Sequence, residues 1–409
     1  MFRSVARTYR AAFSGVPRDI WLLSLVLMVN RAGTMVLPFI SLYLTQERGL
    51  DVTTAGALLS LYGLGSAIGA WVGGWASDRI GAERTLVISL TGSGVLFLWL
   101  GFQQDFWAIA ISIFLLSIVS ESFRPACMTA VAQRAPAALR VRAFALLRLA
   151  ANLGMGVGPA VGGVLALIDY RLLFVADAAT CWAAALLMLR LPGRIAEDPE
   201  EGGGPAGPDL PPWRDGPFLA LLVLVTLLAV SFFQIFSTLP VYFREVYGFR
   251  EDMIGLLLGF NAVIIVVFEM VLVHWAERRD RMTIVGVGAL LVCLGFGLMP
   301  LGSTVAFAAL TIVVWTVGEM LALPLLNVVV AERAGPGNQG RYMGLYTMAF
   351  SVAFIIAPAA GTWTYARFGP SILWVAIGAL GVPLLVASLA LRQALRNPEA
   401  GSRVERLGS

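Results

Sequence analysis

Twelve apolar stretches follow one another along this chain, and each is long enough to cross a lipid bilayer as a helix. The hydrocarbon core of a bilayer is about 30 Å thick, which corresponds to roughly 20 helical residues. Because a backbone in lipid must satisfy its own hydrogen bonds, such stretches predict helices. Charged residues, prolines and glycines separate the stretches, which we place at 20–45, 53–77, 85–103, 106–132, 142–167, 171–190, 218–243, 252–276, 283–301, 304–331, 341–366 and 370–392.

The composition indicates that lipid, rather than water, surrounds most of the surface. Hydrophobic residues make up 58% of the chain and charged residues only 13%, whereas about a quarter of the residues in a soluble domain are charged. The first stretch is longer than a signal-peptide core and lacks a small-residue cleavage site, so we expect a retained spanning helix. The sequence therefore predicts an all-α polytopic membrane protein whose surroundings are a lipid bilayer.

Arginine, the only strongly basic residue because no lysine occurs, is unevenly distributed among the connectors. If both termini are cytoplasmic, the outer connectors contain only Arg48, Arg171, Arg244, Arg250 and Arg367, and the inner segments contain the many others. Positively charged loops resist translocation, so this distribution predicts cytoplasmic amino and carboxyl termini. Arginines in short connectors are a signal of membrane orientation, and no nucleic-acid partner is expected.

The two halves of the chain repeat one another. A shift of 199 positions aligns three pairs of glycines, two pairs of prolines and four pairs of charged residues without a gap. The matches include Gly49 with Gly248, Asp78 with Glu277, Arg79 with Arg278, Pro125 with Pro324, Arg134 with Arg333, Arg142 with Arg341 and Pro159 with Pro358. We therefore expect two pseudo-symmetric six-helix bundles, 1–190 and 218–409, joined by a cytoplasmic linker over 191–217. Repeats of this kind place the solute site near mid-membrane, where the halves meet.

Residues suited to covalent catalysis or metal binding are scarce. The three cysteines lie inside apolar stretches without CxxC spacing, and the only histidine is His274. No glycine-rich phosphate loop and no plausible serine or cysteine triad occur in the sequence. We expect no enzymatic activity, no cofactor and no metal site.

Two motifs resemble a known family. The segment from Gly74 to Arg84 reads GWASDRIGAER and resembles the loop signature of the major facilitator superfamily at Gly74, Asp78, Arg79, Gly81 and Arg84, with departures at Ala82 and Glu83. In the fifth stretch, GMGVGPAVGG resembles the antiporter motif of the drug:proton branch of that superfamily; its matching residues are Gly154, Gly158, Pro159, Gly162 and Gly163, and Ala145 stands where an upstream glycine is usual.

The resemblance covers the chain from the first stretch to the twelfth. It implies rocking-type alternating access, with the first, fourth, seventh and tenth helices around a central cavity. The two motifs are then the residues of conformational gating. In physical terms, Asp78 at a helix end can pair with basic side chains, small residues allow close helix crossings, and proline allows a bend.

Charged side chains inside the stretches are candidate functional residues, because an ionised group at the bilayer centre costs roughly 3 kcal/mol or more. We expect proton coupling by Glu319, Glu269 and Glu121, with Glu319 as first choice; a static partnership between Glu319 and an arginine such as Arg31 is the alternative. Three residues apart on one helix, Glu121 and Arg124 can pair, and a structural network with Arg148 is the competing interpretation. Asp177 is expected to be structural.

Candidate substrate-binding residues combine a guanidinium fork, amides and aromatic rings on the helices that the resemblance places at the cavity. They are Arg31, Asn30, Gln234, Phe236, Arg124 and Tyr346.

These patterns favour a proton-coupled exporter of small amphipathic molecules, acting as a monomer in the bacterial inner membrane. The alternative is a facilitator or symporter that imports an organic anion or another nutrient, since three arginines lie inside the stretches. A helical receptor is disfavoured, because the linker and tails are too short for a signalling domain.

Overall fold

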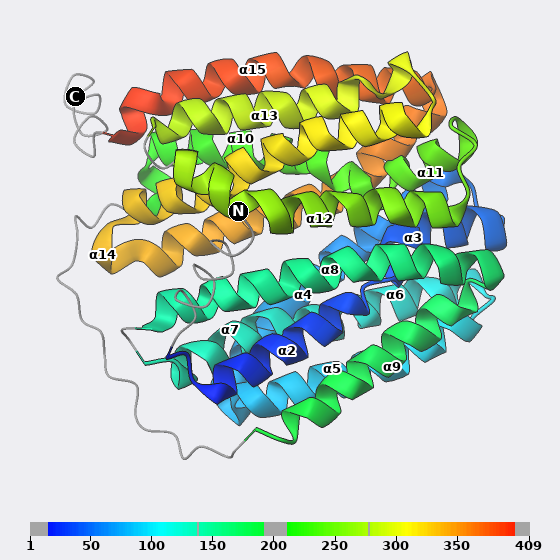
Figure 1. Cartoon of the computed structure of the whole chain (residues 1–409), viewed down its shortest axis with the longest axis horizontal. Helices are drawn as coiled ribbons and strands as arrows, with labels where there is room; N and C mark the ends of the chain where they lie inside the picture. Colours follow the sequence, from blue (N-terminus) through cyan, green and yellow to red (C-terminus); the bar gives the residue numbers. More distant parts are fainter. Residues whose placement is uncertain (1–14, 137–138, 192–210, 277–278, 397–409) are drawn as a thin grey trace. The chain divides into compact units, whose positions relative to one another are not determined.

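The computed structural model describes residues 15–136, 139–191, 211–276 and 279–396, and every regular element in those ranges is a helix (Figure 1). Within these ranges, twelve helical segments are long and apolar enough to cross a membrane, which confirms the predicted number. The elements are α2 (Arg18–Ala32), α3 (Val36–Leu42), the π-helical η1 (Tyr43–Glu47), α4 (Val52–Ile80), α5 (Ala82–Phe102), α6 (Phe106–Glu121), α7 (Phe123–Arg134), α8 (Arg140–Ile168), α9 (Arg171–Met188), η3 (Pro212–Arg214), α10 (Gly216–Phe232), η4 (Phe233–Phe236), α11 (Thr238–Glu245), α12 (Glu251–Ala276), α13 (Arg281–Gly297), η5 (Met299–Leu301), α14 (Val305–Phe368) and α15 (Pro370–Arg396).

Three of the spans are interrupted, where the sequence predicted continuous helices. The interruptions separate α2 from α3, α6 from α7, and α10 from α11. Pro38, Pro125 and Pro240 each lie just after one of these interruptions, so that the backbone carbonyl four residues before each proline lies at the interruption. Proline has no N–H to donate to the carbonyl four residues earlier, and its ring clashes with that carbonyl, so the regular backbone hydrogen bonds of the helix are lost there. Pro159 lies inside α8 without such an interruption.

The chain divides into two compact units. The first unit comprises residues 1–49, 61–200 and 250–263, and the second comprises 50–60, 201–249 and 264–409. The start of α4 thus groups with the second unit, and the start of α12 with the first. Most of the predicted linker, residues 192–210, lies outside the described residues.

The core of the first unit lies among α2, α5, α7, α8 and α9. Figure 1 shows α2 beside α8, and apolar side chains such as Ile20, Leu86 and Val131 fill the space between the helices. In the second unit, α13 packs against both α14 and α15. There the Phe296 ring stacks on Trp315 and on Trp374, at centroid distances of 5.4 and 5.7 Å.

Glycines of the antiporter-like motif bring α8 close to the first span. A Cβ on Gly154 would lie 2.7 Å from the Cβ of Arg31, and one on Gly158 would lie 3.1 Å from the carbonyl oxygens of Ala32 and Thr34. Gly162, one turn further, faces Met35 in the same way. Because these glycines recur every four residues, they form one face that follows the interrupted first helix.

Each unit contains a buried arginine at the end of its fourth span. The side chain of Arg134 is 2% exposed and forms ion pairs with Asp19 at the start of α2 and with Glu83 at the start of α5. The predicted equivalent of Arg134 under the 199-residue shift is Arg333. Its Nε lies 2.8 Å from Oδ2 of Asp215, the residue that precedes α10. The two arginines therefore hold the beginning of the first helix of each repeat in the same manner, as charges removed from water require.

Asp215 forms most of the polar contacts around Arg333. Its carboxylate accepts hydrogen bonds from Arg333, from the Tyr342 hydroxyl at 2.9 Å and from the Phe218 amide at 3.2 Å. Burial opposes ionisation, but the Arg333 hydrogen bond and charge, with the hydroxyl and amide, outweigh it and hold the pKa of Asp215 below its ordinary value of 3.8. Asp215 therefore stabilises the fold above about pH 4, and this contribution is lost as the pH falls through the lower folded-state pKa.

We predict that Asp215→Asn lowers the free energy of unfolding by about 3–5 kcal/mol, because Arg333 remains buried without its counter-charge. The substitution should also remove the corresponding loss of stability in acid. Thermal unfolding can be followed by a thiol-reactive dye, since Cys127, Cys181 and Cys293 are all buried. The control is Glu332→Gln, which breaks the exposed pair with Arg281 and should change stability by no more than about 1 kcal/mol. Equal losses in the two variants would contradict the prediction.

A second prediction concerns the glycine face of α8. Gly154→Val forces α8 away from the first span, so both stability and transport should fall. The control is Gly344→Ala on α14, where an added Cβ meets nothing within 4 Å and helix propensity favours alanine by roughly 1 kcal/mol. Melting temperature and solute flux of both variants in the same lipid check the prediction, and a Gly154→Val protein as stable and active as wild type would refute it.

Candidate functional site

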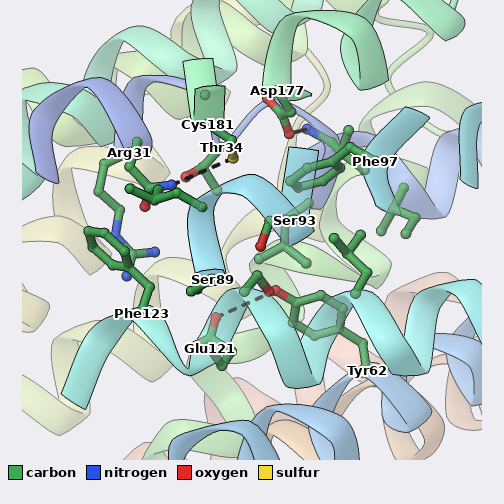
Figure 2. Close-up of a pocket in the computed structure, with 18 residues that line it drawn as sticks. Arg31, Thr34, Tyr62, Ser89, Ser93, Phe97, Glu121, Phe123, Asp177 and Cys181 are labelled. Atoms are coloured by element: carbon green, nitrogen blue, oxygen red, sulfur yellow. Dashed lines mark hydrogen bonds between the residues drawn. The ribbon is translucent and has the colours of Figure 1, made fainter. Parts of the chain in front are cut away.

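A polar cavity lies inside the first unit, against the interruption of the first span (Figure 2). Its volume is about 60 Å³, and its lining comes from α2, the α2–α3 junction, α3, α4, α5, α6, α7 and α9. The space accommodates a few water molecules and is far smaller than the several hundred cubic ångströms of a drug-sized pocket. Arg31, Asn30 and Glu121, three of the predicted site residues, meet there.

Asp177 closes one end of the cavity and holds the interrupted helix in place. Its carboxylate accepts hydrogen bonds from the backbone amides of Met35 and Val36, each at 3.0 Å, and the residue is fully buried. These amides begin α3 and have no carbonyl partner of the helix. The structural role expected for Asp177 is therefore visible in the structure as the cap of α3.

Glu121 lies at the last residue of α6 and contacts Tyr62. The Tyr62 hydroxyl donates to Oε1 of Glu121 over 3.5 Å, as Figure 2 shows. No ion pair joins Glu121 to Arg124 in the described part of the chain, and Arg124 is exposed. Because α6 ends at Glu121 and α7 begins at Phe123, the two side chains do not lie on one regular helix face. The alternative network with Arg148 stays a prediction.

Further polar groups of the cavity lie on α2, α5 and α9. Asn30 donates from Nδ2 to Sγ of Cys181 over 3.7 Å. Arg31 points toward Phe123 in Figure 2, and among the described residues no hydrogen bond or ion pair engages its guanidinium. Ser93 is 2% exposed, and its hydroxyl has no hydrogen-bond partner in the described structure. Sequence reasoning missed Ser93, since a serine within an apolar stretch carries no distinguishing signal.

An aromatic cluster marks the second unit. Phe354 of α14 packs against Phe233 of η4 at 4.8 Å and against Phe236 at 5.9 Å, measured between ring centroids. Phe350 contacts both Phe233 and Tyr346. Tyr346 is buried, while the four phenylalanines are only half-buried. Phe350 and Phe354 are additional candidates that their four-residue spacing could have suggested.

Gln234 is placed differently from the aromatic side chains beside it. It is 2% exposed; its Nε2 donates to the carbonyl of Ala357 at 2.9 Å, and its Oε1 accepts from the Thr238 hydroxyl at 2.7 Å. The amide thus joins the interrupted seventh span to α14. A substrate-binding role for Gln234 stays a prediction, as it does for Asn30, Phe236, Arg124 and Tyr346.

The predicted proton-coupling carboxylates are divided between the units. Glu319 on α14 and Glu269 on α12 are half-buried and belong to the second unit, whereas Glu121 belongs to the first. Their roles stay predictions.

The loop motif at the end of α4 has a backbone conformation that requires glycine at position 81. Gly81 adopts a positive φ of 93°, which side-chain-bearing residues rarely adopt. Arg79 lies over the Trp75 ring at 5.6 Å, and Asp78 and Arg84 are exposed. Glu83, a position where the motif departs from the family pattern, is 39% exposed and forms an ion pair with the buried Arg134. The gating role expected for Asp78 stays a prediction.

In the first unit, the last motif glycine meets the start of α12. A Cβ on Gly163 would collide with the backbone of Glu251 and Asp252, and the Tyr170 hydroxyl lies 3.1 Å from Oε1 of Glu251. The antiporter-like motif therefore supports close helix approaches along its length.

Comparison with solved structures identifies the same architecture. A POT family transporter in complex with 5-aminolevulinic acid superposes with a TM-score of 0.80 at 17% identity, covering 94% of this chain and 98% of that chain. The nucleoside transporter NupG superposes with a TM-score of 0.76 at 14% identity, covering 92% of this chain and 99% of that chain. At these identities the likeness concerns the fold.

Sequence comparison extends the likeness to transporters of bacteria. The Na(+), Li(+), K(+)/H(+) antiporter of Planococcus maritimus is 24% identical over 87% of this chain and 91% of its own length. The multidrug resistance protein MdtH of Enterobacter sp. (strain 638) is 24% identical over 86% of this chain and 89% of its own length. The sequence model of the Major Facilitator Superfamily matches residues 20–358 of this chain. The chain therefore belongs to the Major Facilitator Superfamily and is a multi-pass membrane transporter, not an enzyme.

Proposed function

We propose that this protein exports small amphipathic molecules in exchange for protons, by alternating access of its two six-helix halves. Its proposed location is the bacterial inner membrane, with both termini cytoplasmic and the chain acting as a monomer. The observation that carries the proposal is the half-buried aromatic cluster formed by Phe233, Phe236, Phe350 and Phe354 in the second unit.

The cluster suits solutes that vary in shape. Aromatic rings offer large contact areas at edge-to-face geometry and fix few hydrogen bonds. The one amide in this segment, Gln234, is already satisfied by Ala357 and Thr238 and so imposes little polar selectivity. A relative named as a multidrug resistance protein supports varied solutes, and one named as a cation/proton antiporter supports exchange with protons.

The import of an organic anion is the second candidate, and Arg31 favours it because no described side chain engages its guanidinium. The cavity that Arg31 lines is only about 60 Å³, however, and also contains Asp177 and Glu121. A carboxylate-bearing solute would meet two acidic side chains in a space of water size. The geometry therefore favours the exporter.

Flux in proteoliposomes tests the proposal directly. Tetraphenylphosphonium, a lipophilic cation, should accumulate in vesicles whose interior is acidic, as proton antiport requires. Accumulation driven by protons moving in the same direction would instead identify symport. Arg31→Ala separates the candidates further, because selective loss of flux for anionic solutes would favour import.

We predict that Phe354→Ala weakens tetraphenylphosphonium binding about tenfold, since loss of a central aromatic contact typically costs about 1–2 kcal/mol or more. Equilibrium binding to purified protein measures the effect. Phe368→Ala is the control, because Phe368 lies on the same helix, packs on Trp363 and is 51% exposed. Equal affinities of the two variants would argue against the aromatic cluster as the binding surface.

We also predict that Glu319→Gln abolishes pH-driven accumulation while the protein remains folded, because glutamine keeps the shape of the side chain and cannot exchange a proton. Glu332→Gln on the same helix is the control and should accumulate solute normally. If Glu319→Gln still concentrates tetraphenylphosphonium like wild type, the assignment of Glu319 is wrong.

A further inference from the structure

We propose that the polar cavity of the first unit is a proton-binding site of its own, in which Asp177 and Glu121 share one proton through enclosed water. This inference rests on the proposed proton-coupled function and deepens it. It adds Asp177, expected from sequence to be structural, to the groups that carry the coupling ion.

The first argument is the balance of charge. The titratable groups that face the cavity are Arg31 from α2, Tyr62 from α4, Glu121 from α6, and Asp177 and Cys181 from α9. With both carboxylates ionised, they outnumber the single guanidinium, and the cavity carries a net charge of −1. An unbalanced charge inside a membrane protein is strongly unfavourable. Uptake of one proton makes the cavity neutral.

The second argument is an unsatisfied hydroxyl. Ser93 is 2% exposed and lines the cavity, yet its Oγ has no hydrogen-bond partner in the described structure. In Figure 2 it lies between Asp177 and the Glu121–Tyr62 pair. Buried polar groups almost always find a partner, and an enclosed water supplies one where the space is polar and large enough. Such water would link the two carboxylates.

The size of the cavity selects the ligand. A volume of about 60 Å³ admits water and a proton but excludes an organic solute. A small anion would be repelled by the two carboxylates. The site is therefore separate in kind from the aromatic cluster of the second unit.

The contacts of Asp177 give the proton a means to act on the fold. A carboxylate accepts stronger hydrogen bonds than a neutral carboxyl group. Protonation of Asp177 therefore weakens its hold on the Met35 and Val36 amides that begin α3. The same junction faces Gly158 of α8, where an added Cβ would lie 3.1 Å from the Thr34 carbonyl oxygen. Proton binding is thus linked to the packing of the first span on the antiporter-like motif.

Infrared difference spectroscopy of the reconstituted protein tests the site without any transported solute. On acidification, wild type should develop the C=O band of one buried protonated carboxyl group. The band should lose most of its intensity in Asp177→Asn and in Glu121→Gln, and the double variant should lose no more than the single ones, because the proton is shared. A band that is unchanged in both single variants overturns the proposal.

Two serines provide a matched control. Ser93 and Ser41 are both buried with unpartnered hydroxyls in the described structure, but only Ser93 lines the cavity. Ser93→Ala should shift the frequency or the midpoint pH of the band, and Ser41→Ala should leave both unchanged. Equal spectra for Ser93→Ala and wild type overturn the role of cavity water, and a band that Na⁺ abolishes at constant pH overturns the choice of the proton.

Transport then separates this inference from the proposed function. A pH difference of about one unit supports roughly tenfold accumulation for each exchanged proton. If wild type accumulates tetraphenylphosphonium and Asp177→Asn binds it but does not accumulate it, both proposals hold. Absence of accumulation by wild type, with the carboxyl band intact, refutes the exporter and leaves the proton site standing.

Discussion

The structure depends on one constraint of the lipid environment: a backbone group that leaves its helical ladder needs another partner inside the protein. The first and seventh spans both lose regular helical hydrogen bonds near a proline, and in each case a buried side chain forms hydrogen bonds with backbone groups there. Asp177 accepts hydrogen bonds from the backbone amides that begin α3, and Gln234 donates a hydrogen bond from the seventh span to a carbonyl of α14. Both interruptions therefore have side-chain partners, and these two residues are almost fully buried.

The two units offer different chemistry. The first encloses acidic groups, a guanidinium and hydroxyls around a water-sized space, whereas the second presents a half-buried group of packed rings. One environment suits an ion and the other an apolar surface. The proposed exchange of a proton for an amphipathic molecule would need both. The two units nevertheless share one feature, the buried arginines Arg134 and Arg333 that pair with acidic groups near the start of α2 and of α10.

Much of the fold could be predicted from the sequence, because hydropathy over bilayer-length windows reflects a strong physical constraint. The number of spans was correct for the described residues, although the tenth and eleventh spans lie within one continuous helix, α14. The equivalence of Arg134 and Arg333 reappears in their ion pairs. The interruptions were missed, since Pro125 and Pro240 disrupt a span while Pro159 lies within an uninterrupted α8. The three-residue spacing of Glu121 and Arg124 would allow a pair on a regular helix, but the break between α6 and α7 falls between them, and such a break is not visible in the spacing. Ser93 could not be identified, because its significance comes from tertiary neighbours.

The placement of the three cysteines has a practical consequence for spectroscopy. Cys127, Cys181 and Cys293 are each no more than 2% exposed, so the folded native protein presents almost no thiolate to reagents in water. A single cysteine placed in an aqueous connector would then be the preferred attachment point for a spin label or fluorophore. Distances between pairs of such labels could follow the transport cycle without first removing the natural sulfhydryl groups.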